Sequence, residues 1–304
     1  MQEIVVVGSS NTDMIIKMQR IPKPGETIIG GEFSMAAGGK GANQAVAAAR
    51  AGGQVTFIAR VGNDLFGEEA IKGFADDGIN VDAVIKDANA PSGVALIFVG
   101  SDGENSIAVA SGANAKLSVE DIERTRDIIS SARVLLIQLE SPMETVKAAV
   151  QLAAPETIVI LNPAPAQHLD DEILRRVSIL TPNETEAELL TGVTIENEAG
   201  AATTAAALRA RGVGTVLITL GSQGTYVAGQ EFCGIVRGFS VTPVDTTAAG
   251  DVFNGALAVV LAEKKPLREA VRFANAAAAL SVTKLGAQPS APYRQEIEAF
   301  LSSS

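Results

Sequence analysis

Short apolar runs alternate with helical patterns along most of this chain. Runs typical of strands buried on both faces of a sheet lie at 3–8, 55–62, 133–140, 157–163, 178–183 and 215–221. Helical patterns separate them at 42–51, 65–77, 119–130, 144–153, 184–190 and 199–211, and two long helices are expected near 249–263 and 267–284. This alternation predicts an α/β fold of three layers, with helices on both faces of a mostly parallel central sheet.

Two segments do not fit the alternation. Residues 13–34 and 92–110 have the pattern of short strands joined by Pro/Gly turns, and the second is a hairpin around GSDGEN. The central sheet does not need these strands. We therefore expect them to form one small β-sheet that projects from a main domain made of 1–12, 35–91 and 111–304.

Length and composition narrow the class of protein. The 304 residues are 47% apolar, which suits one large α/β domain with a small appendage. The net charge is −11 without any basic stripe, so nucleic acid is not an expected partner. A polyanionic substrate would need local cations or backbone N–H groups. No apolar run reaches the ~20 residues of a membrane span, so no membrane partner is expected.

The ends and the single cysteine favour a cytoplasmic protein. The N-terminus opens at once as a strand, without the basic flank of a signal peptide. Cys233 is the only cysteine, which excludes an intramolecular disulfide and fits a reducing compartment. It lies in the apolar run EFCGIV, so a buried structural thiol is predicted rather than a nucleophile. His168 is expected on a surface loop.

Ligands of open α/β sheets bind beyond the carboxyl ends of the strands, so the residues after each run deserve scrutiny. Asn11 and Asp13 follow the first strand and suit vicinal hydroxyls, although Asn and Asp also favour plain turns. In AAGGKGANQ, Gly38, Gly39 and Gly41 surround Lys40, and a helix is expected from near Ala42, with Asn43 in its first turn. This stretch is not a Walker A loop, and it favours a ligand loop over a plain helix entry.

Other strand exits carry weaker signals. Glu140 ends an apolar strand, which is costly unless the carboxylate is solvated or partnered, and a simple loop start explains it equally well. Asn183 and Glu186 form a capping box that is compatible with a phosphate nearby. In TLGSQGTYV, Thr219, Gly221 and Gly224 suit either a nucleotide site or a hairpin turn.

The stretch VDTTAAGDVFNGAL, residues 244–257, carries the strongest chemistry. A helix that starts near Ala248–Gly250 directs free N–H groups and its dipole at an anion, and small residues leave room for it. Asp251 is placed to take a proton from a hydroxyl, whereas Asp245 is better placed to hold a cation. Together these features indicate phosphoryl transfer, although an Asp cap on an ordinary Ala-rich helix would explain one of the acids.

GGKGANQAVAAARAG and DTTAAGDVFNGAL resemble the two signature stretches of the ribokinase (PfkB) family of carbohydrate kinases, and the resemblance covers nearly the whole chain in order. It implies a ribokinase-like fold in which the small β-sheet is a lid. It implies an enzyme that transfers phosphate from ATP to the 5-hydroxyl of D-ribose. Mg²⁺, a monovalent cation such as K⁺, and a homodimer formed through the lid belong to the same expectation.

The resemblance also implies residue roles. Asp251 would be the general base, and Ala248, Ala249 and Gly250 would complete the anion hole. The sugar would contact Asn11, Thr12, Asp13, Gly39, Lys40, Gly41, Ala42, Asn43, Glu140 and Asp251. ATP would contact Asn183, Thr219, Leu220, Gly221, Ser222, Gln223, Gly224, Gly250, Asp251 and Asn275. The monovalent cation would lie among Asp245, Thr247, Ser281, Lys284, Gly286 and Ser290, several of them through main-chain carbonyls.

Three other functions stay open or are disfavoured. A kinase of another sugar or nucleoside, such as deoxyribose, fructose or adenosine, fits the same fold. A non-catalytic sugar-binding protein is disfavoured because it has no need of a base at Asp251. A dinucleotide-dependent dehydrogenase is disfavoured because GxGxxG does not follow the first strand.

Overall fold

The computed structural model describes residues 4–303. Within them, the central sheet has nine strands in the order β13-β12-β11-β10-β9-β8-β1-β4-β5, parallel except for the antiparallel pairs β11–β12 and β12–β13. The strands are β1 (Ile4–Val7), β4 (Val55–Gly62), β5 (Val84–Asp87), β8 (Val134–Ile137), β9 (Ile158–Leu161), β10 (Ile179–Leu180), β11 (Thr215–Thr219), β12 (Gly224–Ala228) and β13 (Cys233–Arg237).

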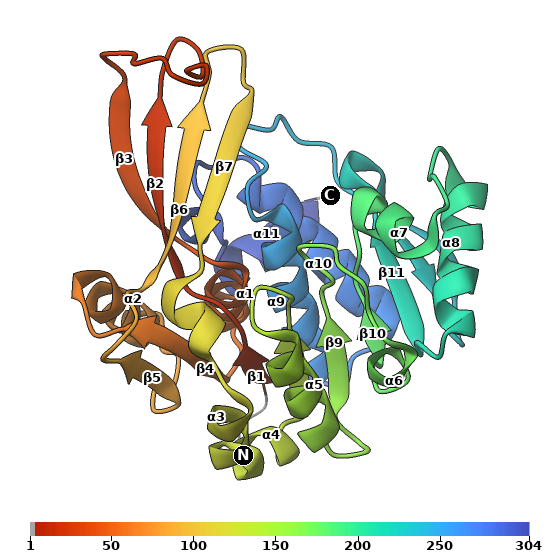
Figure 1. Cartoon of the computed structure of the whole chain (residues 1–304). Helices are drawn as coiled ribbons and strands as arrows, with labels where there is room; N and C mark the ends of the chain where they lie inside the picture. Colours follow the sequence, from red (N-terminus) through yellow and green to blue (C-terminus); the bar gives the residue numbers. More distant parts are fainter. Residues whose placement is uncertain (1–3, 304) are drawn as a thin grey trace.

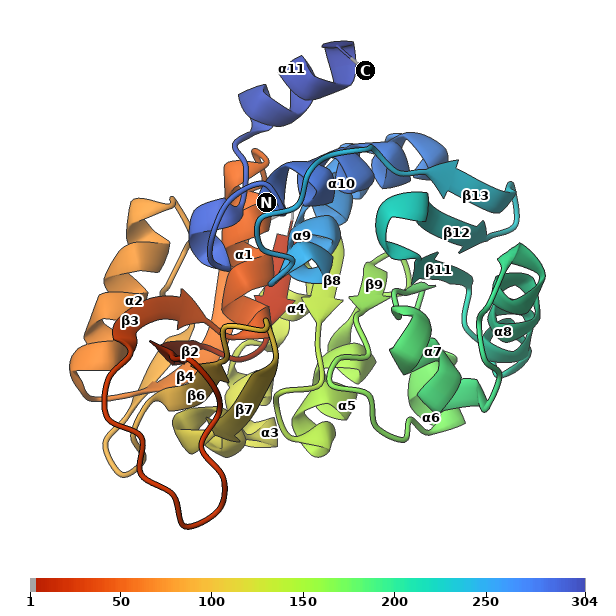
Figure 2. The same ribbon diagram turned by 90° about the horizontal axis from the view of Figure 1, so that it is seen from above.

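Helices cover both faces of this sheet, as predicted, and the core is therefore double (Figures 1 and 2). Alternate residues of β1 show the division, because Ile4 and Val6 pack into one apolar cluster and Val5 and Val7 into the other. The first cluster includes α1 (Lys40–Arg50), α2 (Leu65–Asp76), α9 (Ala249–Ala262), α10 (Leu267–Ser281) and α11 (Arg294–Ser303). The second includes α3 (Val119–Arg124), α4 (Arg126–Ser130), α5 (Met143–Leu152), α6 (Asp171–Leu174), α7 (Glu184–Thr191) and α8 (Glu198–Ala210).

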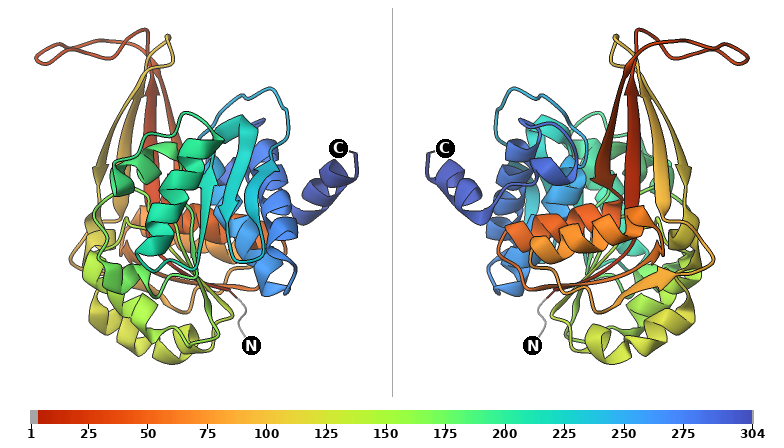
Figure 3. Two further views of the ribbon diagram at one scale, coloured as in Figure 1. Left: turned by 90° about the vertical axis from the view of Figure 1, so that its right-hand side faces the viewer. Right: turned by 90° about the vertical axis from the view of Figure 1, so that its left-hand side faces the viewer.

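A second sheet of four strands, the lid sheet, projects from the main body (Figures 1 and 3). Its order is β3-β2-β6-β7, with β2 and β6 parallel and the other pairs antiparallel. The strands are β2 (Asn11–Lys17), β3 (Glu32–Gly38), β6 (Gly93–Val99) and β7 (Asn105–Ala110). The two segments that did not fit the sequence pattern thus form one sheet. The first of them is longer than predicted, because β2 begins at Asn11 and β3 ends at Gly38 rather than at residues 13 and 34.

The pattern of strands and helices agrees with the prediction, and the differences have local causes. The helix expected at 119–130 is divided at Thr125, whose Oγ1 donates to the Ile122 carbonyl at 2.9 Å and so competes with the helical backbone. Helix α1 begins at Lys40 rather than near Ala42. The short elements β5 and α6 and the terminal helix α11 were not predicted.

Two surface predictions had different outcomes. Cys233 was expected to be buried, and this was wrong: the thiol is exposed because Cys233 is the first residue of β13, the antiparallel edge strand. Its sulfur lies 3.4 Å from the Gly229 carbonyl oxygen. His168 is on the surface as expected, with 84% of its side chain exposed. Within residues 4–303, no helix is both long and apolar enough to span a bilayer.

Candidate active site

Helix α9 begins in the loop that the sequence singled out. Its N-cap is Ala248, whose φ of 59° is left-handed, and the Ala249 N–H lies 3.4 Å from the Thr246 carbonyl. A side chain added at Gly250 would meet no atom within 4 Å, so the protein leaves the space over this backbone open. The first N–H groups of α9 therefore face a gap that can hold an anion.

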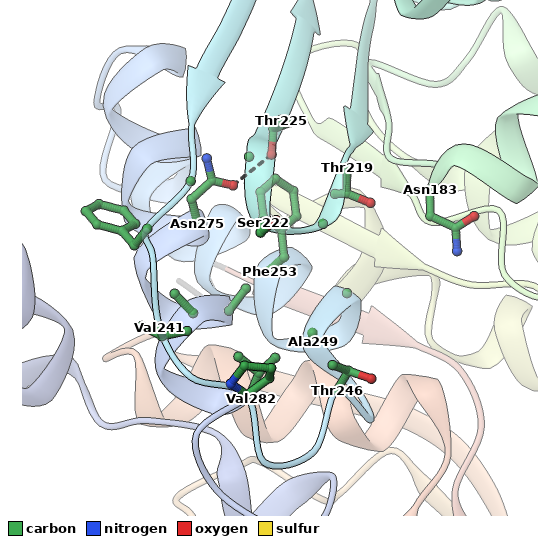
Figure 4. A pocket seen from close by; sticks show the side chains of 18 of the residues that line it. Asn183, Thr219, Ser222, Thr225, Val241, Thr246, Ala249, Phe253, Asn275 and Val282 are labelled. Atoms are coloured by element: carbon green, nitrogen blue, oxygen red, sulfur yellow. Dashed lines mark hydrogen bonds between the residues drawn. The ribbon is translucent and has the colours of Figure 1, made fainter. Parts of the chain in front are cut away.

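A cavity of about 480 Å³ adjoins the start of α9, a volume typical of small-molecule sites (Figure 4). The ends of β11 and β12, helix α10 and the chain from Gly238 to Thr246 enclose it. Of the residues predicted to bind ATP, those that line it are Asn183, Thr219, Gly221, Ser222, Gly224, Gly250 and Asn275. The cavity is long enough to reach from the exit of β11 to Ala249 and Gly250.

Three residues predicted for the ATP site lie outside this cavity. Leu220 is buried, Gln223 lines a separate hollow, and Asp251 lies behind the loop. Asn275 does line the cavity, but its amide also accepts from Thr225 at 2.7 Å and donates to the Val236 carbonyl at 3.0 Å. Asn275 thus ties α10 to β12 and β13, which shapes the cavity wall.

On the far side of the loop, carboxylates gather around one ammonium group. Burial, Glu140 and Asp251 raise the pKa of Asp13 to about 6. Burial likewise raises the pKa of Asp251, against the opposing effects of Lys40, Asn43 and Gln44. Burial lowers the pKa of Lys40, but Asp251, Glu140 and Glu186 outweigh it, so its net pKa is raised. The cluster can keep Lys40 charged while its carboxylates compete for protons.

Two amides hold Asp251, which is 6% exposed. Asn43 Nδ2 donates to Oδ2 at 3.0 Å, and Gln44 Nε2 donates to Oδ1 at 2.9 Å. In the part of the chain that the structure describes, Asn43 Oδ1 is buried without a hydrogen-bond partner. Such an atom is free to accept from a ligand hydroxyl.

Gly38 and Gly39 of the stretch AAGGKGANQ lie very close to residues of strand β2. A Cβ on Gly38 would lie 2.4 Å from Asp13 Oδ1, and one on Gly39 would lie 2.7 Å from the Asn11 nitrogen. Gly39 also has a φ of 89° as the N-cap of α1. The glycines therefore let the start of α1 lie against β2, where Asp13 is located.

The remaining residues predicted to contact the sugar divide into two groups. Glu140 is partnered, since it accepts from the Lys40 N–H at 2.9 Å and from the Ser9 hydroxyl. Asn11 Oδ1 accepts from Asn114 at 2.8 Å, which leaves its NH₂ group for a ligand. Thr12, Gly41 and Ala42 do not present side chains to the cluster: strand alternation turns Thr12 to the other face, and the other two are buried near Ser9.

The two loops of the predicted cation site are adjacent. Asp245 joins them, because Oδ1 accepts from the Thr247 N–H and Oδ2 from the Gly286 N–H, each at 2.9 Å. Burial raises the pKa of Asp245, but these hydrogen bonds outweigh it and keep its pKa below the usual value. Ser281 and Ser290 are fully buried.

The Ser281 and Ser290 hydroxyls donate to the Ala278 and Ala287 carbonyls, each at 2.8 Å. The Lys284 ammonium points away and pairs with Glu296 at 2.8 Å, so Lys284 has only its main-chain oxygen to offer. Carboxylate, hydroxyl and carbonyl oxygens suit a hard monovalent cation. Among the described residues, no group of three or more His, Cys, Asp and Glu side chains is arranged for a metal ion.

Sequence reasoning missed several polar residues beneath this site. Gln138 and Asn162 are buried at the ends of the apolar strands β8 and β9, and Asn114 is buried beside the lid sheet. The signal that drew attention to Glu140, a polar side chain in or beside an apolar run, was also present at Gln138 and Asn162. Glu186 was interpreted as part of a capping box compatible with a nearby phosphate. Burial raises its pKa, against the opposing effects of the Asn183 N–H and Lys40.

The arrangement places a cavity for a large ligand and a polar cluster on either side of one helix start. A family profile described as pfkB family carbohydrate kinase matches residues 1–294. The chain belongs to the pfkB family of carbohydrate kinases.

Relatives within the pfkB family match this chain over almost its full length. It is 46% identical to a ribokinase from Haemophilus influenzae over 98% of both chains. The solved structure of a ribokinase from Thermotoga maritima is 41% identical, with a TM-score of 0.91 over 99% of this chain and 100% of that one. A ribokinase from Arabidopsis thaliana, solved in complex with ribose and ATP, is 36% identical, with a TM-score of 0.90 over 100% and 99%.

Proposed function

We propose that this kinase transfers the γ-phosphoryl group of ATP to the 5-hydroxyl of D-ribose, giving D-ribose 5-phosphate and ADP. The observation that carries the proposal is the position of Asp251. It lies at the start of α9, between the cavity of about 480 Å³ and the cluster formed by Asp13, Lys40 and Glu140. Full-length similarity to ribokinases supports the choice of sugar.

In this mechanism Asp251 takes the proton of the sugar hydroxyl as that oxygen attacks the phosphoryl group. The backbone N–H groups of residues 248–251 stabilise the charge that develops on the phosphoryl oxygens, with the Ala249 N–H also lying 3.4 Å from the Thr246 carbonyl. Lys40 adds a positive charge beside the same loop. Asn43 Oδ1, buried without a partner among the described residues, accepts a sugar hydroxyl and helps to orient it.

ATP is expected to bind in the cavity as its Mg²⁺ complex, which supplies charge neutralisation on the phosphates. Oxygen ligands suit Mg²⁺, and Glu186 offers a carboxylate in the same electrostatic environment as Asp251 and Lys40. We also propose an activating monovalent cation, K⁺, at the adjacent Asp245 and Gly286 loops, where the Asp245 carboxylate and main-chain carbonyls would be its ligands.

The segments 13–34 and 92–110 act in this proposal as a lid over the sugar, on a main domain formed by 1–12, 35–91 and 111–304. A closed lid would exclude water, which otherwise competes as phosphoryl acceptor. The face of the lid sheet turned away from Asp13 exposes Phe33, Met35 and Leu96 at 62%, 52% and 45%. Such an apolar patch supports a homodimer formed through the lids. We propose separately that the protein acts in the cytoplasm, because its single cysteine fits a reducing compartment.

A coupled assay of ADP release tests the function. Ribose, deoxyribose, fructose and adenosine are compared with and without K⁺, and ribose should have the highest kcat/KM. Faster turnover of any other acceptor would replace ribose as the substrate. No turnover of any of the four would support a non-catalytic binding protein.

Two variants test the assigned residues. Asp251→Asn should lower kcat by about 10²–10⁴-fold while ribose still binds in calorimetry, because the variant keeps the shape but loses the base. A near-normal kcat would show that Asp251 is not the base. Asp245→Ala should abolish the response to K⁺, whereas an unchanged K⁺ titration would remove the cation from this loop pair.

A further inference from the structure

A chain of buried amides lies beneath Asp251, outside the residues to which the proposed mechanism gives a role. Gln44, Gln138 and Asn162 are 0%, 1% and 6% exposed. Gln44 Nε2 donates both to Asp251 Oδ1 at 2.9 Å and to Asn162 Oδ1 at 3.1 Å. Gln138 Nε2 donates to Gln44 Oε1 at 2.6 Å, so the Gln44 amide is held from both ends.

A main-chain carbonyl determines which atom of each side-chain amide is the donor and which is the acceptor. Asn162 Nδ2 donates to the Thr181 carbonyl at 3.0 Å, and a carbonyl can only accept. The Asn162 oxygen must therefore face Gln44, which turns the NH₂ group of Gln44 toward Asp251. This orientation follows from Thr181 alone, whatever the charge on Asp251.

A second branch joins the same threonine to the helix start. The Thr181 hydroxyl donates to Asn254 Oδ1 at 2.7 Å, and Asn254 Nδ2 donates to the Gly250 carbonyl at 2.8 Å. Asp251 and the preceding residue of the anion loop are thus fixed to one point at the end of β10.

Two glycines make the close approach possible. A Cβ on Gly255, one turn beyond Asp251 on α9, would lie 2.6 Å from the Gln44 carbonyl oxygen and 2.7 Å from Ala47 Cβ. A Cβ on Gly8 would lie 2.2 Å from Gln138 Oε1. The backbone contact between α1 and α9 is therefore what brings the Gln44 amide within reach of the carboxylate.

We propose that Gln44 is a positioning residue for the phosphoryl-transfer base: the chain from the Thr181 carbonyl through Asn162 fixes one N–H donor on Asp251 and keeps that carboxylate oriented and able to accept a proton. This inference rests on the proposed function of Asp251. A hydrogen bond to an ionised carboxylate is stronger than a neutral one and favours the ionised form. It offsets the burial that favours the protonated, inactive form.

Charged groups face Asp251 from every side, and they remain in place when Gln44 is changed. They are Lys40 on α1, Glu140 after β8, Asp13 on β2 and Glu186 on α7. The pKa of Asp13 is raised to about 6, so Asp13 also contributes to the pH profile, but it is present in the wild type and in the variant alike. The difference between their pH profiles therefore reports the effect of Gln44.

The test is Gln44→Met, which keeps a long unbranched side chain but removes the donor. We measure kcat against pH at saturating ribose and ATP, where the profile reports the enzyme–substrate complex. The acid limb should move to higher pH, so that kcat at about pH 6 relative to its plateau falls roughly tenfold, while KM changes less than about twofold. Asn162→Leu, which removes the link to Thr181, should move the limb less.

Thr157→Val is the matched control, because it deletes a buried hydroxyl bonded to the Ala132 carbonyl at the opposite end of the sheet. It should lower the melting temperature without moving the acid limb. An unmoved limb in Gln44→Met, or a loss of kcat equal at all pH values, would overturn the positioning role. The Asp251→Asn variant distinguishes this inference from the proposed function. If Asp251→Asn retains normal kcat, Asp251 is not the base and the proposed function fails. If Asp251→Asn is inactive but the acid limb of Gln44→Met does not move, only the positioning role of Gln44 is refuted.

Discussion

The cluster formed by Asp13, Lys40 and Glu140 lies between two regions that differ in how deeply they are buried. Its floor, helices α1 and α9, is buried from Gly41 to Ala48 and from Asp251 to Ala262. Its cover, the lid sheet, projects from the main body (Figure 3). The lid sheet is exposed along all of β7 and carries large apolar side chains in solvent. In the proposed mechanism, the floor holds the groups that do the chemistry, and the cover controls access to them.

The difference in burial indicates which region is rigid and which is free to move. A base and an anion loop must keep their geometry, and a floor with glycine contacts and directed amides has little freedom to change it. A lid must open and close, and elements with few buried contacts open most readily. We expect changes in the floor to affect stability strongly and changes in the lid to affect it weakly.

The largest effect should come from Gly255→Ala in the floor. The added Cβ would lie 2.6 Å from the Gln44 carbonyl oxygen and would separate α1 from α9. We expect a loss of about 1–3 kcal/mol in the free energy of unfolding, measured by urea denaturation. Gly73→Ala on α2 is the control, since its Cβ would meet no atom within 4 Å, and it should stabilise by about 0.5–1 kcal/mol. Equal effects of the two substitutions would show that the contact between α1 and α9 is not tightly packed at Gly255.

The next effect concerns Asp13, where lid and floor meet. Its pKa is raised from 3.8 to about 6 in the folded protein, so the folded state binds more protons between these values. Stability from protonated Asp13 is present below pH 3.8 and lost as the pH rises through about 6. Asp13→Asn should therefore be more stable than wild type at neutral pH, with the gain disappearing toward pH 3.8. A gain independent of pH would contradict this linkage.

Phe33→Lys in the lid should change the stability of the fold less, but it should disrupt the proposed dimer. The side chain is 62% exposed, so the fold should tolerate the lysine. If the lids form a dimer, the wild-type melting temperature rises with protein concentration and that of the variant does not. Sedimentation should show a dimer for the wild type and a monomer for the variant. A wild type that is monomeric at all concentrations would remove the dimer proposal.

The smallest effect should come from Arg20→Ala. Arg20 pairs with Glu26 in the connection between β2 and β3, where both side chains are substantially exposed. Exposed ion pairs contribute little to stability, so the melting temperature should change by less than about one degree. A large decrease would show that this connection is packed against something in solution.

The sequence predicted the parts of this molecule that have local signals. The strands β1 and β8 are continuous apolar runs, and the start of α9 has a stretch of small residues that an ordinary helix cap does not explain. The capping box of Asn183 and Glu186 also follows from local spacing. Contacts between distant residues have no such signal. The bonds from Gln44 to Asn162 and Asp251 join residues 118 and 207 positions apart, so they were found only in the fold.

The attachment of the lid has a kinetic consequence. Asn11 is the first residue of β2, and it pairs with Gly38 at the end of β3 and with Gly93 at the start of β6. Asn11, where the lid joins the body, is thus also proposed to hold the sugar, and Asp13, which is proposed for the same role, is two residues away on β2. A lid that swings open would withdraw its own hydroxyl ligands. The residence time of the sugar should then equal the lifetime of the closed lid, so the two rates should change together when the hinge is altered.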